Sequence, residues 1–84
     1  MIEASQIESE VITFLQREVF APEVVLTHES DLIAAGFDSM SLVRLLLFVE
    51  SSYGLWLPER EINRETLQSV RSLAATVHRL IPTP

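Results

Sequence analysis

The serine at position 39 is the residue whose type and surroundings most clearly favour chemistry. It follows Gly36, Phe37 and Asp38, and aspartate is a residue type that often caps the start of a helix. The free N–H groups and the dipole at a helix N-terminus stabilise an anion, so a phosphodiester on Ser39 would lie in a favourable field. The plainer alternative is that Ser39 is a first-turn capping residue and nothing more.

Catalysis by Ser39 as a nucleophile is disfavoured by the residues around it. Residues 36–41 lack the G-x-S-x-G pattern of a nucleophile elbow, and the candidate bases, His28 and His78, lie in unrelated segments. Two isolated histidines without any cysteine also predict that there is no metal site. The chain has no lysine, which excludes a Schiff-base or P-loop lysine. We therefore expect that Ser39 is not a catalytic nucleophile.

The composition predicts one globular domain spanning residues 1–84. Hydrophobic residues make up 48% of the chain, which is enough for a packed core and argues against disorder. Twelve acidic residues and six arginines give a formal net charge of −6, so the basic footprint that nucleic acid requires is lacking. No apolar run approaches the roughly 20 residues of a membrane span, and the acidic start is unlike a signal peptide. We expect a cytoplasmic monomer, with no membrane or nucleic-acid partner, that binds proteins presenting basic surfaces.

The spacing of apolar residues predicts an all-α fold. Ser5 and Glu8 form the S-x-x-E pattern of a capping box, and apolar residues then recur at helical spacing to about residue 19. Pro22 ends this helix and opens a long connection to Asp38, in which a single helical turn ended by Gly36 is expected.

Two further long helices follow this connection. The second helix is expected from Asp38 to about Tyr53, with Gly54 as its terminating residue. Ser69 is expected to cap the last helix, and Asn63 a short turn before it. The fold class is therefore a small four-helix bundle, with three main helices, one short helix and a long first loop.

The second helix is apolar on two faces. One face is expected to pack in the core through Leu42, Leu45, Leu46, Val49 and Tyr53. The nearly opposite face carries Met40, Val43 and Leu47, which we call the docking stripe. A central helix packed on all sides would explain both faces, but a bundle of this size has too few elements to cover them. The docking stripe is therefore predicted to be exposed and to bind a partner.

The motif Asp38-Ser39-Met40, at the head of a helix after a long loop, resembles the D-S-L/M motif of acyl and peptidyl carrier proteins. The resemblance covers roughly residues 7–80, with Asp31-Leu32, Tyr53-Gly54, Pro58 and Ser69-Val70 at corresponding places. It implies an acyl-carrier-protein-like fold and a 4′-phosphopantetheine arm on Ser39, added from coenzyme A by a phosphopantetheinyl transferase. The arm ends in a thiol that holds cargo as a thioester, while the carrier itself performs no catalysis. By the same resemblance Asp38 is a cap and transferase contact, and Met40 and Val43 are recognition residues.

The resemblance also bears on the branch of the family. Arg44 stands where fatty-acid carriers tend to have glutamate, and the pattern is closer to D-alanyl carriers and stand-alone aminoacyl and peptidyl carriers. Leu67 stands where D-alanyl carriers tend to have tryptophan. A discrete aminoacyl or peptidyl carrier is favoured, serving specialised metabolism such as non-ribosomal peptide, polyketide or antibiotic biosynthesis. A D-alanyl carrier and a fatty-acid or polyketide acyl carrier remain alternatives, as does an unmodified helical adaptor.

The expected partners follow from this branch. An adenylate-forming ligase or acyltransferase would load the carrier, and condensing, synthase or tailoring enzymes would receive its cargo. Contacts with them are expected from the docking stripe and Arg44, with Phe48 adding apolar surface. Trp56, in the loop after the second helix, is expected instead to cap the core. Large core side chains leave no room for a deep acyl tunnel, so a small aminoacyl cargo is favoured.

Overall fold

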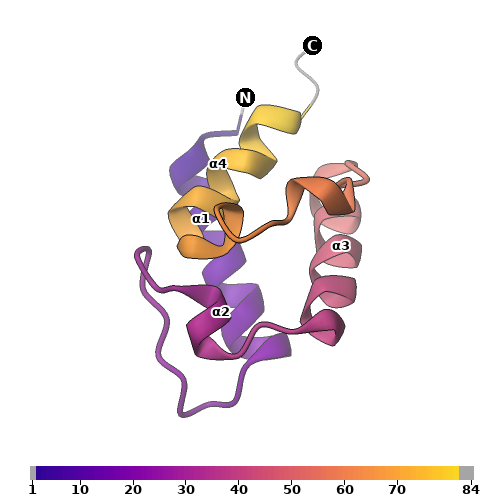
Figure 1. Cartoon of the computed structure of the whole chain (residues 1–84). Coiled ribbons are helices and arrows are strands. Elements are labelled where there is room, and N and C mark those ends of the chain that lie inside the picture. Colours follow the sequence, from indigo (N-terminus) through magenta and orange to yellow (C-terminus); the bar gives the residue numbers. More distant parts are fainter. Residues whose placement is uncertain (1, 82–84) are drawn as a thin grey trace.

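The computed structural model of the chain describes residues 2–81, and all regular elements in that range are helical (Figure 1). The four α-helices are α1 (Ala4–Phe14), α2 (Leu32–Ala35), α3 (Ser39–Tyr53) and α4 (Val70–Leu80). A π-helical turn, Leu15–Val19, extends α1, and two short 3-10 turns, Glu59–Glu61 and Thr66–Gln68, lie between α3 and α4. The expected all-α fold, with a long loop after the first helix, is confirmed.

The start of the first helix differs from the sequence-based prediction. The helix begins at Ala4, with Glu3 at its N-cap position and no side-chain capping bond, so the expected capping box of Ser5 and Glu8 is wrong. Ser5 already lies inside the helix, where its carbonyl accepts a hydrogen bond from the Ser9 hydroxyl at 3.3 Å. The Glu8 carboxylate is directed away from the N-cap, toward the first loop and α4.

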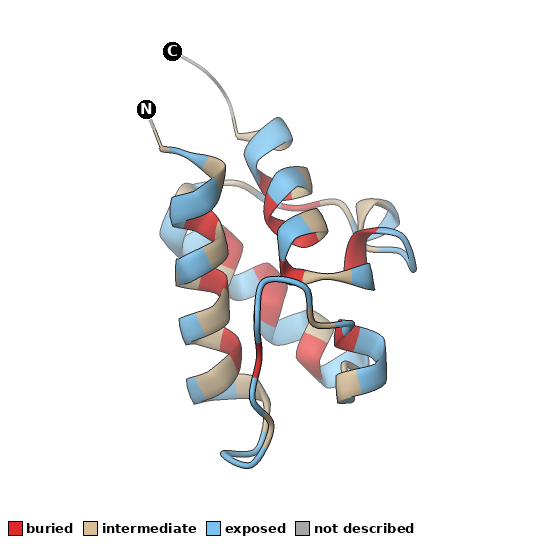
Figure 2. Cartoon of the chain, turned by 90° about the vertical axis from the view of Figure 1, so that its left-hand side faces the viewer, coloured by how far each residue is buried: buried red, intermediate tan, exposed pale blue. Residues whose placement is uncertain are grey.

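The core lies between α1, α3 and α4, and Figure 2 shows the buried residues on their facing sides. α1 packs against α4. Each fully buried aliphatic side chain contributes about 1.5–3 kcal/mol of transfer free energy, so this face decides how the helices sit. The buried apolar residues are Ile7, Val11, Leu15, Leu26, Leu32, Leu45, Leu46, Val49, Leu57, Leu67, Val70, Leu73, Ala74 and Val77.

One aromatic contact joins α3 to α1, and a second lies within α3. The ring of Phe48 stacks on Phe14 with centroids 4.3 Å apart and planes 10° apart, and it meets Tyr53 edge-on at 5.9 Å. The Tyr53 hydroxyl donates a hydrogen bond to the Glu10 carboxylate at 2.6 Å. The prediction that Phe48 adds to the recognition surface is therefore wrong, because its half-buried ring is used within the fold.

The ends of α3 are set by local chemistry that the sequence predicts correctly. At the C-terminal end Gly54 adopts a left-handed conformation with φ 66°, which residues with a Cβ rarely adopt. After this turn the chain runs back beside α3 before it reaches α4 (Figure 1). Residues 56–60, which we call the returning segment, therefore lie next to α3.

Candidate functional site

Ser39 is the first residue of α3, and its side chain is exposed. Among residues 2–81 no group hydrogen-bonds to its hydroxyl, so the oxygen is available for reaction. The 15 residues of α3 give the helix a full dipole, and the N-terminal N–H groups face the same end. A phosphate ester at this oxygen would meet positive potential, so the site fits a covalently attached anionic group.

The capping role belongs to Asp38, as predicted, and not to Ser39. The Asp38 carboxylate accepts hydrogen bonds from the backbone N–H of Ser41 at 2.9 Å and from the Ser41 hydroxyl at 3.0 Å. These two bonds hold the pKa of the Asp38 carboxyl below its usual value of 3.8. The lowered pKa favours the charged carboxylate beside Ser39. Because Asp38 makes the capping bonds, the Ser39 hydroxyl is not needed for the cap.

The short helix α2 and the turn after it, residues 31–37, lead directly into this site. Asp31 caps α2 by accepting a hydrogen bond from the N–H of Ala34 at 3.1 Å. Gly36 then reverses the chain at φ 112°, and Phe37 donates its N–H to the Leu32 carbonyl at 2.9 Å. The single turn expected inside the long loop is therefore confirmed, and it sets the direction in which α3 begins.

The long loop before α2 is tied to the bundle by contacts that the sequence did not indicate. Gln16 donates to the Val24 carbonyl at 2.7 Å and accepts from the N–H of Leu26 at 2.8 Å. Because one side chain satisfies both groups, the loop is fixed against the end of the first helix.

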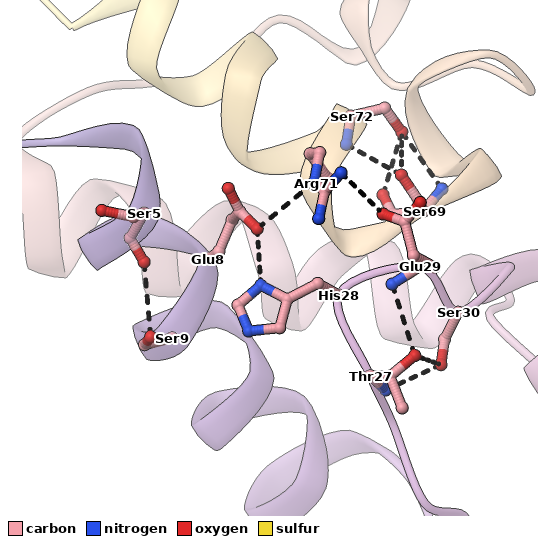
Figure 3. A network of polar contacts seen from close by, with 10 residues as sticks. All are labelled: Ser5, Glu8, Ser9, Thr27, His28, Glu29, Ser30, Ser69, Arg71 and Ser72. Atoms are coloured by element: carbon pink, nitrogen blue, oxygen red, sulfur yellow. Dashed lines mark hydrogen bonds and ion pairs between the residues drawn. The ribbon is translucent and has the colours of Figure 1, made fainter.

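Figure 3 shows a second tie, in which Glu8 lies between His28 and Arg71. The His28 Nδ1 and Glu8 Oε1 atoms are 2.5 Å apart, and the Arg71 Nε lies 3.9 Å from the same oxygen. The Arg71 guanidinium also pairs with the Glu29 carboxylate at 3.3 Å. The backbone N–H of Arg71 donates a hydrogen bond to the His28 carbonyl at 3.0 Å. These polar contacts join α1, the first loop and α4, so they are structural and lie apart from Ser39.

The docking stripe is exposed, as the helical spacing predicted. The exposed fractions of its side chains are 62% for Met40, 51% for Val43 and 55% for Leu47. The opposite face of α3 carries the buried Leu45 and Val49. Exposed aliphatic side chains in a row are unusual on a small monomer and are typical of an interaction surface.

Arg44 has a structural contact as well as an exposed position. Its guanidinium donates a hydrogen bond to the Glu18 carbonyl at 2.8 Å, near the end of the first helix. A cation at a helix C-terminus is favourable, because the carbonyls there carry partial negative charge. The side chain predicted to meet partners therefore also joins α3 to the first helix.

A groove beside the docking stripe is the feature that the sequence did not indicate. It has a volume of about 680 Å³ and is lined by Val43, Leu46 and Leu47 on one side. Trp56, Glu59 and Arg60, from the returning segment, line the other side. Trp56 is 61% exposed, so the prediction that it caps the core is wrong. The buried Leu57 fills that core position, and chain reversal at Gly54 directs the neighbouring indole outward.

Other kinds of site find little support among residues 2–81. No group of three or more His, Cys, Asp or Glu side chains in that range is arranged to hold a metal ion. His28 is bound to Glu8, and His78 is exposed near the end of α4. Within the described part of the chain, none of the helices has the length and apolar character needed to span a bilayer.

Comparison with known proteins adds a sequence relationship to this geometry. Models of known protein families give no match. The aminoacyl carrier protein of Agrobacterium fabrum is 32% identical over 56 residues, which cover 67% of this chain and 68% of the relative. Aminoacyl carrier protein 2 of Bradyrhizobium diazoefficiens is 35% identical over 69 residues, or 82% of this chain and 75% of the relative.

A solved structure gives a matching result in three dimensions. It is the crystal structure of Bradyrhizobium japonicum glycine:carrier protein ligase complexed with glycylated carrier protein. The matched chain superposes with a TM-score of 0.63 and 30% identity, covering 87% of this chain and 96% of that one.

Proposed function

The chain belongs to the aminoacyl carrier protein family, and we propose that it holds an aminoacyl group as a thioester on a 4′-phosphopantetheine arm attached to Ser39. The observation that carries the proposal is an exposed serine with a free hydroxyl at the first position of α3. The dipole and N–H groups of that helix end suit a phosphodiester, so the residues present fit the group. The arm supplies the thiol to which the cargo is joined.

The residues around Ser39 have separate roles in this function. The Ser39 oxygen forms the bond to phosphorus when a phosphopantetheinyl transferase acts with coenzyme A, from which 3′,5′-ADP leaves. Asp38 keeps the helix end in place through Ser41 and offers its remaining oxygen to the transferase. The carrier itself supplies position and a favourable field, and the enzymes that it visits supply the catalysis.

The cargo is proposed to be an amino acid or a similarly small carboxylic acid, loaded by an adenylate-forming ligase. The relatives are named as aminoacyl carriers, and the solved neighbour is a glycylated carrier with its ligase. The interior of this chain also favours a small cargo, because Leu45, Val49 and Leu73 are fully buried and packed. A long acyl chain between the helices would have to separate these side chains and open a cavity.

The partners are proposed to bind the docking stripe, with Arg44 at its edge. Exposed aliphatic side chains one and two turns from Ser39 place an enzyme surface beside the attachment point. After loading, a condensing or tailoring enzyme of specialised metabolism would receive the aminoacyl group. An acyltransferase is the alternative loading partner, and fatty-acid and D-alanyl carriers are the alternative classes of carrier.

A loading experiment tests the proposal. The protein is first converted by a phosphopantetheinyl transferase and coenzyme A, and the product is then offered to amino-acid:carrier protein ligases with ATP and single amino acids. Intact mass should increase by one phosphopantetheinyl group and then by one aminoacyl residue. An unmodified helical adaptor would show neither increase, and it would leave Ser39 as an ordinary first-turn residue.

A further inference from the structure

Three side-chain contacts join α3 to the first helix and its π-helical turn, and we call them the seam. They pair Arg44 with the Glu18 carbonyl, Phe48 with Phe14, and Tyr53 with Glu10. The members on the first helix and its turn are four residues apart, and those on α3 are four and then five residues apart. Because the order of the partners is reversed, the two segments run antiparallel, and each four-residue step covers about 6 Å of helix. The contacts therefore lie at three successive levels along α3.

We infer that the seam sets the position of α3 along and about its axis, and so presents Ser39 and the docking stripe to partner enzymes. Where the inference concerns partners it rests on the proposed function, whereas the geometry of the seam does not. It gives a positioning role to residues of the first helix, which lie outside both the motif around Ser39 and the docking stripe.

The core contacts of α3 define its position only in part. Its buried apolar side chains, Leu45, Leu46 and Val49, form a single stripe. Apolar burial is non-directional and follows the area covered, so it discriminates weakly between small shifts of a helix along or about its axis. A rotation by one residue position, about 100°, would carry the docking stripe away from the face on which it is exposed. Directional contacts are therefore needed to hold this face in place.

The seam supplies such directional contacts at both ends and in the middle. The Glu18 carbonyl is among the last carbonyls of its helix, which lack partners within the helix, and the Arg44 guanidinium donates to it. A hydrogen bond weakens steeply away from its preferred angle, so this bond and the one made by the Tyr53 hydroxyl resist sliding of α3. The Phe14 and Phe48 rings, whose planes are 10° from parallel, resist its rotation between them.

Glu10 and Phe14 give the cleanest test, because they belong to α1 whereas Ser39 and the docking stripe belong to α3. They reach a partner on the docking stripe through α3 and are therefore positioning residues. Arg44 lies beside the docking stripe, so its substitution would change a partner contact and the seam together. When α3 holds the docking position in only a fraction of the molecules, the apparent affinity for a partner falls by that fraction.

A kinetic experiment measures this effect with a phosphopantetheinyl transferase and coenzyme A. The parent protein is compared with Tyr53→Phe, Glu10→Ala and the double variant, at a temperature where circular dichroism shows each to be folded. We expect KM for the carrier to rise about fivefold in each single variant, the factor that one ordinary hydrogen bond is worth, with kcat unchanged. The double variant should show the same rise, because either substitution alone breaks the bond. Thr13→Ala, which changes an exposed residue of α1 outside the seam, should match the parent protein.

Residual dipolar couplings of the backbone N–H groups test the geometry on the unmodified proteins, without any partner. α1 and α4 pack against each other and provide the reference frame. We expect the couplings of α3 to shift in Tyr53→Phe and Glu10→Ala, and to keep their parent values in Thr13→Ala. Unshifted α3 couplings in the folded seam variants, or a KM equal to that of the parent protein, would overturn the positioning role. A parent protein that gains no phosphopantetheinyl group would overturn the attachment to Ser39 instead, and the couplings would still decide the role of the seam.

Discussion

The Asp38 carboxylate binds Ser41 twice, through the backbone N–H at 2.9 Å and through the hydroxyl at 3.0 Å. Ser39, which directly follows Asp38, is exposed and makes no such bond among the described residues. Capping and the proposed attachment are thus divided between neighbouring residues. A substitution of Asp38 should therefore remove the cap and leave the Ser39 hydroxyl in place, and a substitution of Ser39 should do the reverse.

Asp38→Ala should lower the thermal unfolding temperature at neutral pH, because the N–H of Ser41 loses its acceptor. Asp38→Asn should be affected less, since asparagine caps helices about as well but lacks the charge. Thermal unfolding followed by circular dichroism measures both changes. An alanine variant as stable as the parent protein would show that the cap is dispensable.

The same pair predicts a dependence on pH. The pKa of Asp38 is lowered in the folded protein, so its stabilising effect is present above the unfolded-state pKa of about 3.9 and is lost as pH falls through the folded value. The stability difference between the parent protein and Asp38→Asn should therefore shrink as the pH falls below about 3.9. A difference that stays constant over this range would contradict the assignment.

Tyr53→Phe should destabilise the fold by about 1 kcal/mol, because it removes the hydrogen bond to Glu10 and leaves the ring packing in place. Burial, together with that bond, raises the pKa of Tyr53 above its usual value of 10. The stabilisation is therefore present below about pH 10 and is lost as pH rises through the folded value. Urea unfolding of both proteins checks the difference, and Glu10→Gln serves as the second arm of a double-mutant cycle.

Val43→Asp should impair loading and transfer of cargo while changing the free energy of unfolding by no more than about 0.5 kcal/mol, since the side chain is half exposed. Val25→Asp is the matched control, because Val25 is exposed but lies outside the docking stripe. Ligase kinetics and urea unfolding are measured on both. A large loss of stability in Val43→Asp alone would show that Val43 is a core residue.

The modified protein should accept small amino acids from adenylate-forming ligases and should be a poor substrate for a fatty-acid:carrier synthetase. Its recognition should depend little on salt, because the docking stripe is apolar and exposed ion pairs are what salt screens. Efficient loading by the fatty-acid enzyme alone, with shifts of the Leu46 and Val49 NMR signals that grow with chain length, would contradict the cargo class.

The sequence predicted those parts of the fold and site that depend on local chemistry. Asp38, Gly36 and Gly54 were assigned correctly because a cap or a positive φ needs only the residue and its near neighbours. The exposure of Met40 followed from helical spacing in the same way. The capping box of Ser5 failed because the helix begins two residues earlier than predicted, with Glu3 at the N-cap position.

The groove depends on contacts between distant residues, which the sequence did not reveal. Whether Trp56 or Leu57 enters the core is decided by how the chain turns at Gly54 and lies against α3. Phe48 likewise turned inward because Phe14, on another helix, offered a face to stack on. The sequence signal for the groove was a tryptophan three residues after the end of α3, a helix with an exposed apolar stripe. A tryptophan at that position is equally compatible with a place in the core.

Attachment at Ser39 is tested most directly by intact mass after incubation with coenzyme A and a phosphopantetheinyl transferase. The parent protein and Ser51→Ala, which changes an exposed serine on the same helix, should each gain one phosphopantetheinyl group. Ser39→Ala should gain none, while its unfolding free energy stays within about 0.5 kcal/mol of the parent, because Asp38 supplies the cap. A phosphopantetheinyl group on Ser39→Ala, or none on the parent protein, would contradict the account.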